Sequence, residues 1–322
     1  MAPPADTPNP IQGPGENDFT SQIHNDTYDA ISPTNFDLSG KAIFISGGSK
    51  GIGRAMTLSF ARAGASYIAV GARSDMSSLE RDVMTAAKEA GRKAPTFLPV
   101  KFDCTDQKST EEAAAKVEKD FGHCDIVINN AGIVGQMAPI LDSDPNQWWQ
   151  VWNVNLRGPY LVVKAFLPLL LKGGDKTFVT VGSVGAHLVM PGLSSYQTTK
   201  LAVLRFTEFL GEEYKDQGVL AYTIHPGNVK TDIMGDFDAM PEELKRCKFG
   251  RFATQKWPET DSPPIVFTES PEISADSLVY LTSEKREWLQ GRYINVTWNM
   301  PELMAKKDEI VEGDKLKVRL VL

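Results

Sequence analysis

The 322-residue chain has few cysteines and few histidines. Its three cysteines are odd in number and lack metal-like spacing, which predicts reduced thiols of a cytoplasmic protein rather than a disulfide framework. The four histidines are scattered, so we predict no metal site. His187 alone is singled out, because it lies four residues after Ser183 and could border a pocket. The remaining members of the two sets are Cys104, Cys124, Cys247, His24, His123 and His225.

A basic excess and long apolar runs are also missing. The chain carries 34 Lys and Arg against 41 Asp and Glu, a net charge of -7, without a long basic cluster. This argues against a nucleic-acid partner. The longest apolar run, 161–171, is too short to span a bilayer and is interrupted by Lys164 and Pro168. The first residues show no basic segment followed by an apolar one. We therefore predict a soluble, cytoplasmic protein with no nucleic-acid or membrane partner.

Hydrophobic periodicity is missing from residues 1–37, where prolines and glycines crowd the start. This predicts a flexible N-terminal arm, ordered only where its apolar side chains find a surface. These side chains are Phe19, Ile23, Tyr28 and Phe36. We expect the folded domain over 38–300 and a C-terminal extension over 301–322. Leu316, Val318 and Leu320 alternate with basic residues, which predicts an edge strand in this extension.

From residue 42 onward, short apolar segments alternate with helical patterns. The alternation predicts an α/β fold in which a doubly wound parallel sheet carries helices on both faces. The polar motifs follow the carboxyl ends of the strands, where such sheets bind ligands. The expected strands are 42–46, 67–70, 96–102, 125–129, 177–181 and 219–224, and the expected helices are 54–63, 77–91, 111–121, 144–171 and one beginning near residue 194.

A glycine-rich turn follows the first expected strand and precedes the first expected helix. Its glycines have the spacing Gly-x-x-x-Gly-x-Gly and allow a tight turn with close approach of a ligand. The N–H groups at the start of the helix suit a pyrophosphate. The order of strand, turn and helix therefore predicts a dinucleotide site. Its candidate residues are Gly47, Ser49, Lys50, Gly51, Ile52 and Gly53.

The second expected strand ends at Arg73, about 20 residues after Gly53. In dinucleotide folds an acidic residue there binds the 2′-hydroxyl of NAD, whereas an arginine suits the 2′-phosphate of NADP. Arg73 and Lys50 therefore favour NADP(H). Asp75, two residues further on, is the counterargument, and both cations could also be solvated surface charges.

Tyr196 and Lys200 are four residues apart, so they share one face if a helix begins near residue 194. Ser183 follows the strand expected just before them. A cation beside a phenol favours the phenolate and lowers the tyrosine pKa, which suits proton exchange with an alcohol or ketone. Taken alone, Tyr-x-x-x-Lys also occurs on ordinary surface helices.

Together the motifs resemble the short-chain dehydrogenase/reductase family. They are Ser46-Gly47-x-x-x-Gly51-Ile-Gly53, Asn129-Asn-Ala-Gly132, Asn155, Ser183, Tyr196-x-x-x-Lys200 and Pro226-Gly227, in family order over residues 38–298. The resemblance implies a single Rossmann-type domain of about seven parallel strands and a nicotinamide cofactor. It also implies a small-molecule ketone or alcohol substrate and a homodimer or homotetramer.

By resemblance, a tetrad carries the chemistry. Tyr196 is the general acid in reduction, Ser183 polarises the carbonyl, and Lys200 binds the nicotinamide ribose and lowers the tyrosine pKa. Asn155 anchors a water that links Lys200 to solvent. Asp103 binds the adenine, although it also resembles a helix N-cap. The remaining cofactor candidates implied are Asn130, Ala131, Gly132, Pro226, Gly227, Val229 and Thr231.

The chain departs from the family pattern in three places. Thr297-Trp298-Asn299 stands where the family often has Asp-Gly-Gly, which weakens the case for the usual tetramer. Residues 235–271, where the family keeps its substrate lid, are long and rich in proline, and they predict an irregular cover. The C-terminal extension is the third departure. The extensions and lid resemble those of fungal secondary-metabolism or detoxifying members.

We therefore predict an NADPH-dependent reductase that converts a ketone to a secondary alcohol. The alternatives are an NAD-dependent alcohol or polyol dehydrogenase working oxidatively, or a scaffold that holds the cofactor without turnover. An apolar or polycyclic substrate is favoured over a sugar phosphate by the apolar character of the pocket candidates. These are Val134, Met137, Leu188, Val189, Met190, Pro191 and Leu193.

Overall fold

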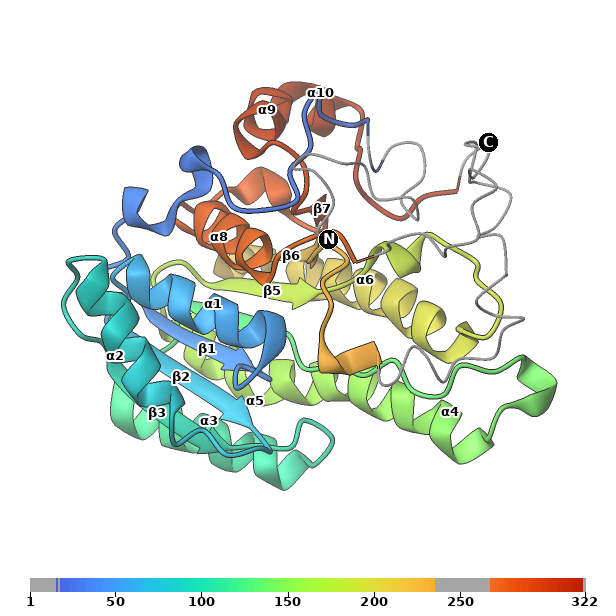
Figure 1. The fold of residues 1–322 in the computed structure, drawn as a ribbon, viewed down its shortest axis with the longest axis horizontal. Coiled ribbons are helices and arrows are strands. Elements are labelled where there is room, and N and C mark those ends of the chain that lie inside the picture. Colours follow the sequence, from blue (N-terminus) through green and yellow to red (C-terminus); the bar gives the residue numbers. More distant parts are fainter. Residues whose placement is uncertain (1–15, 17, 235–266, 321–322) are drawn as a thin grey trace.

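A seven-stranded parallel sheet forms the centre of the molecule (Figure 1). The computed structural model describes residues 16, 18–234 and 267–320. The strand order is β3-β2-β1-β4-β5-β6-β7, so the order reverses between β1 and β4. The predicted doubly wound, Rossmann-type sheet is confirmed. The strands are β1 (Ala42–Ser46), β2 (Tyr67–Ala72), β3 (Thr96–Lys101), β4 (Ile126–Asn129), β5 (Thr177–Val181), β6 (Leu220–His225) and β7 (Tyr293–Asn295).

Helices cover both faces of the sheet (Figure 1). Strand β1 shows why, because Ile43 and Ile45 join the apolar core on one face while Ala42 and Phe44 join the core on the other. One face carries α1 (Gly51–Arg62), α2 (Leu79–Glu89) and α8 (Pro271–Thr282). The other carries α3 (Gln107–Phe121), α4 (Pro145–Trp152), α5 (Gly158–Lys172) and α6 (Ser194–Tyr214). Two short helices, α9 (Met300–Ala305) and α10 (Lys307–Glu312), follow β7.

The predicted long helix around Asn155 is present, with a local change of winding. Helices α4 and α5 are joined by a π-helical turn over Asn153–Arg157, so the helix is continuous from 145 to 172. Asp144 caps its start by accepting from the N–H groups of Asn146 and Gln147. By length and composition this helix alone among the described residues could cross a membrane. In this fold, however, 61% of its apolar window is buried inside the protein.

The N-terminal segment from residue 18 to 37 lies along the carboxyl end of β7 and against α8. Ile23 and Trp298 form an antiparallel bridge, and the His24 N–H donates to the Thr297 carbonyl oxygen at 2.7 Å. The Phe19 ring lies 4.7 Å from the Trp298 ring. Residues Phe19, Tyr28 and Phe36 all pack against the core, as expected of side chains that find a surface.

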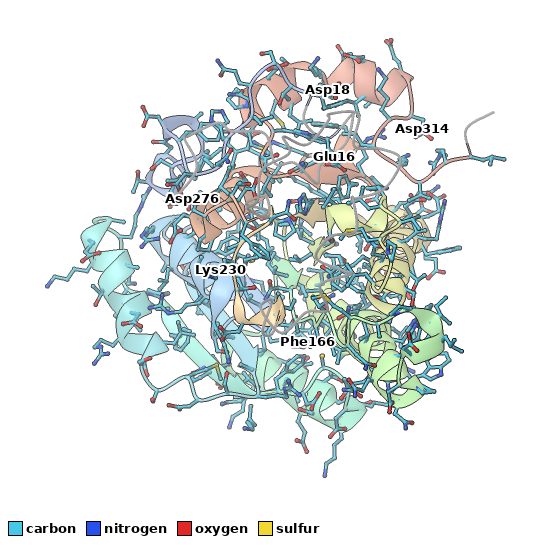
Figure 2. The ribbon with its side chains drawn as sticks, turned by 45° about the vertical axis from the view of Figure 1, so that its right-hand side comes forward. Glu16, Asp18, Phe166, Lys230, Asp276 and Asp314 are labelled. Atoms are coloured by element: carbon cyan, nitrogen blue, oxygen red, sulfur yellow. The ribbon has the colours of Figure 1, made fainter. Side chains whose placement is uncertain are left out.

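Asp276 of α8 ties the same N-terminal segment to α1. Its buried carboxylate accepts hydrogen bonds from Ser59 in α1 at 2.6 Å and from Thr27 at 2.5 Å. Figure 2 shows Asp276 on α8, on the side that faces the N-terminal segment. Burial raises the pKa of Asp276, while both hydroxyl bonds act in the opposite direction. The chain start is thus connected to the helix that begins at the glycine-rich turn.

The prediction of an edge strand in the C-terminal extension is wrong. Residues 315–320 form no strand, because Asp314 and Leu316 adopt left-handed backbone angles, with φ of 45° and 63°, that bend the chain. One backbone bond reaches β7, from the Tyr293 N–H to the Leu316 carbonyl oxygen at 2.8 Å.

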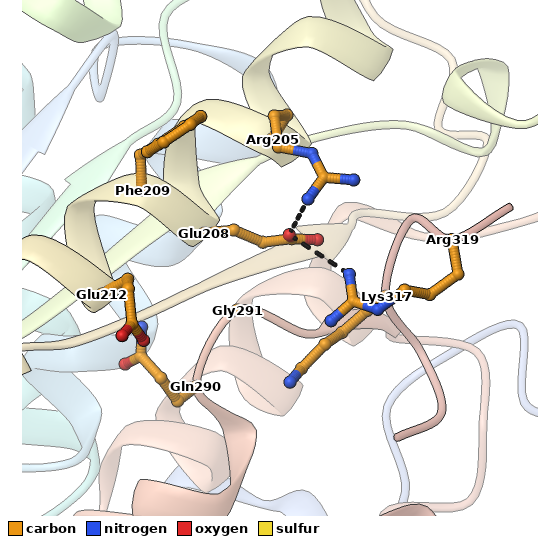
Figure 3. Close-up of a pocket in the computed structure, with 8 residues that line it drawn as sticks. All are labelled: Arg205, Glu208, Phe209, Glu212, Gln290, Gly291, Lys317 and Arg319. Carbon is orange, nitrogen blue, oxygen red and sulfur yellow. Dashed lines mark hydrogen bonds and ion pairs between the residues drawn. The ribbon is translucent and has the colours of Figure 1, made fainter. Parts of the chain in front are cut away.

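The extension is held instead by side chains on α6. Glu208 of α6 accepts from Arg205 of the same helix and from Arg319 of the extension. These three side chains and Lys317 line a shallow charged pocket (Figure 3). Because its charges are already paired with one another, we read this pocket as a clamp on the chain end rather than as a binding site.

Candidate functional site

The glycine-rich turn has the backbone geometry that its sequence predicts. Gly47 has a φ of 70°, and a Cβ on it would lie 3.0 Å from the Ala131 Cα. At Gly53 a Cβ would lie 2.3 Å from the Gly47 carbonyl oxygen, closer than any side chain can come. The side chain of Lys50, the N-cap residue of α1, makes no capping bond, and no other side chain among the described residues caps this helix. Its N–H groups are therefore left for an anion such as a pyrophosphate.

Asn130 supports this turn from the neighbouring strand. Its side-chain amide donates to the carbonyl oxygens of Ser46 and Gly47, both at 3.1 Å. The Ser46 hydroxyl in turn accepts from the N–H groups of Asn130 and Ala131. The structure thus gives Asn130 a role in shaping the turn. Gly132 lies next to two tetrad residues, since a Cβ there would be 3.4 Å from the Asn155 side-chain oxygen and 3.7 Å from Lys200 Nζ.

The end of β2 carries one cation, Arg73, and one carboxylate, Asp75, that already accepts hydrogen bonds. Arg73 is exposed at the strand tip. Asp75 also lies there, but its carboxylate accepts from the N–H and hydroxyl of Ser77 at 3.1 and 2.5 Å. These bonds lower the pKa of Asp75. Lys50 points elsewhere and forms a surface ion pair with Asp232 at 3.5 Å, so Arg73 is the better placed of the two predicted cations.

Asp103 is not the N-cap of α3, as its sequence context allows. That role belongs to Asp106, whose carboxylate accepts from the Lys108 N–H at 2.9 Å. The Asp103 carboxylate accepts instead from the N–H and hydroxyl of Thr105. Partial burial opposes ionisation of Asp103, but these bonds and the charge of Arg73 outweigh it and lower its pKa. Asp103 therefore stays an anion beside the tip of β2.

The loop after β6 closes the cofactor side of the site. Gly227, which follows Pro226, has a φ of 79° and packs against Glu269, whose carboxylate accepts from the Asn228 N–H at 2.8 Å. Val229 bridges to Glu269. Thr231 then lies over the glycine-rich turn, because a Cβ on Gly51 would be 3.3 Å from its methyl group. Two loops that are 180 residues apart in sequence thus meet at one edge of the sheet.

The tetrad residues come together at the carboxyl ends of β4 and β5. Helix α6 begins at Ser194, as predicted, so Tyr196 and Lys200 lie one turn apart on one face. The Ser183 side chain hydrogen-bonds to the Tyr196 hydroxyl, and the Ser183 oxygen accepts from the Gly185 N–H at 3.0 Å. Lys200 donates from Nζ to the Val181 carbonyl oxygen at 2.9 Å, and its Nζ lies 5.6 Å from the centroid of the Tyr196 ring.

The electrostatics of Tyr196 and Lys200 differ from the sequence expectation. Burial raises the pKa of Tyr196, and the Ser183 hydrogen bond only partly opposes this effect. Burial also lowers the pKa of Lys200 to about 8. The expected lowering of the tyrosine pKa by Lys200 is therefore not what this geometry gives. A phenol that keeps its proton near neutral pH is suited to donate it, as a general acid must.

Asn155 connects three parts of the site. Its side-chain oxygen accepts from the Ile133 N–H at 2.9 Å, and its amide donates to the Ile133 carbonyl oxygen and to the Thr199 hydroxyl. The π-helical turn around Asn155 is the kind of local distortion that often marks functional sites. Asn155 thus fixes the strand-end segment beside Lys200 to helix α6.

Several residues of this site carry no signal in the sequence. Thr199 supports Asn155, and Gln197 holds the loop before α6 by accepting from the Met190 N–H at 2.8 Å.

Of the pocket candidates, Val134 is buried, whereas Val189 is 83% exposed on the described structure. The predicted lid, 235–271, lies mostly outside the described residues, and nothing tests it. Within the part of the chain that is described, no three His, Cys, Asp or Glu side chains gather as a metal site would require.

Comparison with known proteins places the chain in a family. A family model described as short chain dehydrogenase matches residues 41–242. The short chain dehydrogenase pigC of Monascus ruber is 57% identical over 321 residues and is covered in full, as is this chain. The short chain dehydrogenase mpl6 of Monascus purpureus is 47% identical, with 94% of this chain and 97% of the relative covered. The chain spans 63% of a third relative, tazN of Aspergillus terreus, at 49% identity.

Solved structures show the same fold. A short-chain type dehydrogenase/reductase from Mycobacterium ulcerans superposes with a TM-score of 0.67 at 21% identity, covering 81% of this chain and 89% of that one. A 3-ketoacyl-(acyl-carrier-protein) reductase from Brucella melitensis, complexed with NADH, gives 0.63 at 25% identity, covering 81% and 98%. The chain belongs to the short chain dehydrogenase family. It is therefore an oxidoreductase that uses a nicotinamide cofactor on a small molecule, and the glycine-rich turn and the free N-terminus of α1 fit that cofactor.

Proposed function

We propose that the protein is an NADPH-dependent reductase that converts a ketone on an apolar or polycyclic substrate to a secondary alcohol. The observation that carries the proposal is the contact between Ser183 and Tyr196 at the end of β5, with Lys200 one turn further along α6. A hydroxyl that receives an N–H bond and a protonated phenol converge there, so one carbonyl oxygen could accept from both.

In the proposed reaction the bound nicotinamide supplies a hydride to the carbonyl carbon. Ser183 orients the carbonyl oxygen by donating a hydrogen bond to it, and Tyr196 gives that oxygen its phenolic proton. The raised pKa of Tyr196 supports this direction, because a protonated acid is present at neutral pH. Lys200 and Asn155 would hold the ribose side of the site and restore the proton.

The preference for NADPH is supported by the tip of β2. Arg73 forms no ion pair within 4.0 Å among the described residues, although the charges of Arg73 and Asp103 interact, and Asp75 is already bonded to Ser77. A 2′-phosphate would find a cation there, whereas the 2′-hydroxyl of NAD would find a carboxylate whose lone pairs are partly used. Solved relatives complexed with NADH or NAD make NADH the competitor that any test has to include.

The proposal is tested by following NADPH consumption with a panel of aryl and polycyclic ketones. Tyr196→Phe keeps the ring but removes the transferable proton, so kcat should fall about 100- to 10,000-fold. NADPH affinity should stay within about twofold, since the hydroxyl hydrogen-bonds to Ser183 rather than to the glycine-rich turn. Near-normal turnover in Tyr196→Phe would refute the tetrad mechanism. Faster oxidation of alcohols with NAD than reduction with NADPH would favour a dehydrogenase, and binding without any turnover would favour a scaffold.

A further inference from the structure

Glu16 of the N-terminal segment lies among side chains at the carboxyl end of β7. This part of the site is on the side where we propose that the substrate binds. Its carboxylate accepts from the Asn295 side-chain amide at 2.9 Å, and its carbonyl oxygen accepts from the Trp298 indole N–H at 2.6 Å. Figure 2 shows Glu16 among the C-terminal elements, nearer the centre of this view than Asp18. A carboxylate from the very start of the chain thus reaches the carboxyl end of β7.

Tyr293 connects Glu16 with the tetrad side of the sheet. Tyr293 pairs in register with Thr223 of β6, so both side chains point to the same face. That face carries α6, because a Cβ on Gly182 would touch both Thr223 and Leu204 of α6. Both Glu16 and Tyr196 contribute to the raised pKa of Tyr293, after burial itself. On this face Tyr293 lies two residues before Asn295, the partner of Glu16, and packs against His187, which follows Ser183 by four residues.

His187 completes this group on its open side. Its ring stands edge-on to Tyr293, with ring centroids 4.7 Å apart, and it follows the short turn Val184–Ala186 that begins at Ser183. His187 is exposed, Glu16 is partly buried, and the Tyr293 hydroxyl is fully buried. The nearby His225 is buried and its pKa is lowered to about 3 by burial, by His187 and by Lys200, which leaves it neutral.

Anchoring of the N-terminal segment does not account for a carboxylate at this position. The segment is already held by the bridge from Ile23 to Trp298, by the Phe19 ring on Trp298 and by bonds from Ser21 to Glu302. Burying a carboxyl group costs free energy, and burial raises the pKa of Glu16 to about 7 against the opposing hydrogen bond from Asn295. A neutral side chain would anchor the chain without that cost.

We propose that Glu16, with Tyr293 and His187, forms a recognition site for a hydroxyl group that the ketone substrate carries away from its reacting carbonyl. The substrate class is then a hydroxylated aryl or polycyclic ketone, whose hydroxyl donates to Glu16 while its carbonyl meets Ser183 and Tyr196. The inference rests on the proposed function for the identity of the reacting group, but the recognition of the hydroxyl is a separate property of the protein.

The test compares ketones that differ only in this hydroxyl. Wild-type protein should prefer 6- or 7-hydroxy-1-tetralone over the matching methoxy-1-tetralone by about 10- to 100-fold in kcat/KM, the value of a hydrogen bond to a charged or buried group. Glu16→Gln keeps an oxygen acceptor for Asn295 but weakens acceptance from the substrate. It should reduce the preference to less than about threefold, mainly through KM.

Glu302→Gln is the matched control, because it loosens the same N-terminal segment at Ser21, on the outer surface. It should keep the wild-type preference. The proposal is overturned if wild type shows no preference, if Glu16→Gln retains it, or if Glu302→Gln loses it equally. Thermal unfolding of all three proteins shows whether any loss comes from misfolding, and Glu16→Asn then serves as the second variant.

A non-reducible probe separates this inference from the proposed function. With NADPH present, 2-naphthol should bind wild type about tenfold more tightly than 2-methoxynaphthalene does, and Glu16→Gln should remove the difference. If no ketone is reduced but this difference is found, the proposed function fails and the recognition site stands. If ketones are reduced and neither the tetralone nor the naphthol pair is distinguished, the recognition site fails alone.

Discussion

The two halves of the sheet's carboxyl edge are assembled in different ways. The proposed cofactor half, from β1 to β4, is made mainly of short turns next to their own strands: Gly47 to Gly53 after β1, Arg73 after β2 and Asn130 after β4, with Thr231 from the loop after β6 lying over the first of them. The substrate half, from β5 to β7, brings together Ser183, the start of α6, and Glu16 from 279 residues before its partner Asn295. The first half depends on backbone shape and the second on long-range packing. Cofactor binding and substrate recognition should therefore fail separately.

The largest expected effect concerns the substrate half. Trp298→Ala removes a side chain that is 1% exposed and that packs against Phe19 and bonds to Glu16. It should lower the free energy of unfolding by about 3–5 kcal/mol, as for other buried tryptophans. Chemical denaturation measures the loss, with Trp149→Ala as control, because Trp149 is 59% exposed and should cost less than about 1 kcal/mol. NADPH affinity of the folded Trp298→Ala protein should stay unchanged, and a parallel loss of affinity would remove the distinction between the halves.

The next effect is confined to the cofactor half. Gly53→Ala places a Cβ 2.3 Å from the Gly47 carbonyl oxygen, so α1 or the turn has to shift. NADPH binding measured by calorimetry should weaken by about 100-fold or more, or about 2.7 kcal/mol. Gly174→Ala is the control, since its Cβ would lie 3.5 Å from the Asp125 carboxylate at ordinary contact distance. Tight NADPH binding by Gly53→Ala would show that the turn does not hold the pyrophosphate.

A smaller expected effect is confined to the cofactor half and distinguishes the roles of its two cations, Arg73 and Lys50, in cofactor binding. Arg73→Ala should weaken NADPH binding about tenfold and leave NADH binding within twofold, because only the 2′-phosphate needs the charge. Lys50→Ala should change either affinity less, since Lys50 pairs with Asp232. Fluorescence titration of both cofactors measures these changes. An equal loss of affinity for NADH and NADPH in Arg73→Ala would favour Asp75, rather than Arg73, as the residue that determines cofactor preference.

The smallest expected effect is a pH dependence of NADPH binding that arises from Lys200, a residue that serves both halves of the site. Its pKa is lowered to about 8 by burial, below that of an ordinary lysine, so the ammonium loses its proton as the pH rises through 8. An anionic cofactor is held better by the charged form. NADPH binding to the free protein should therefore be constant below about pH 7.5 and weaken several-fold by pH 9.5. Lys200→Met should bind more weakly at every pH and show no such slope, and a slope that persists in this variant would assign the titration to another group.

Local sequence was sufficient for the cofactor half and for the tetrad. Strand, glycine turn and helix follow one another directly, so Gly47, Gly51 and Gly53 could be placed without any tertiary contact. Tyr196 and Lys200 needed only the start of α6 near residue 194. Local sequence left the N-cap of α3 open, because Asp103 and Asp106 are three residues apart and only the observed bonds show that Asp106 caps the helix.

The remaining features depend on contacts that no local pattern records. Glu16 stands in a segment without hydrophobic periodicity, and its bonds to Asn295 and Trp298 are set by the path of the chain around β7. The alternation of basic and apolar residues from 315 to 320 predicts a strand, but the left-handed backbone angle of Leu316 prevents one. The direction of the Tyr196 pKa shift was not predicted, because burial outweighs the Ser183 hydrogen bond and burial is known only once the fold is known.

The two borders of the sheet are protected against strand addition by different means. On β3, Pro99 lacks an N–H group, and the exposed Lys101 adds charge, both of which discourage pairing with another chain. On β7, the protection comes from the chain's own ends: Leu316 accepts from Tyr293, and Ile23 pairs with Trp298 just beyond the strand. Expression tags or truncations that displace residues 18–24 or 314–318 would therefore uncover a strand border. Aggregation of such variants, with the catalytic tetrad intact, would be the practical sign of its loss.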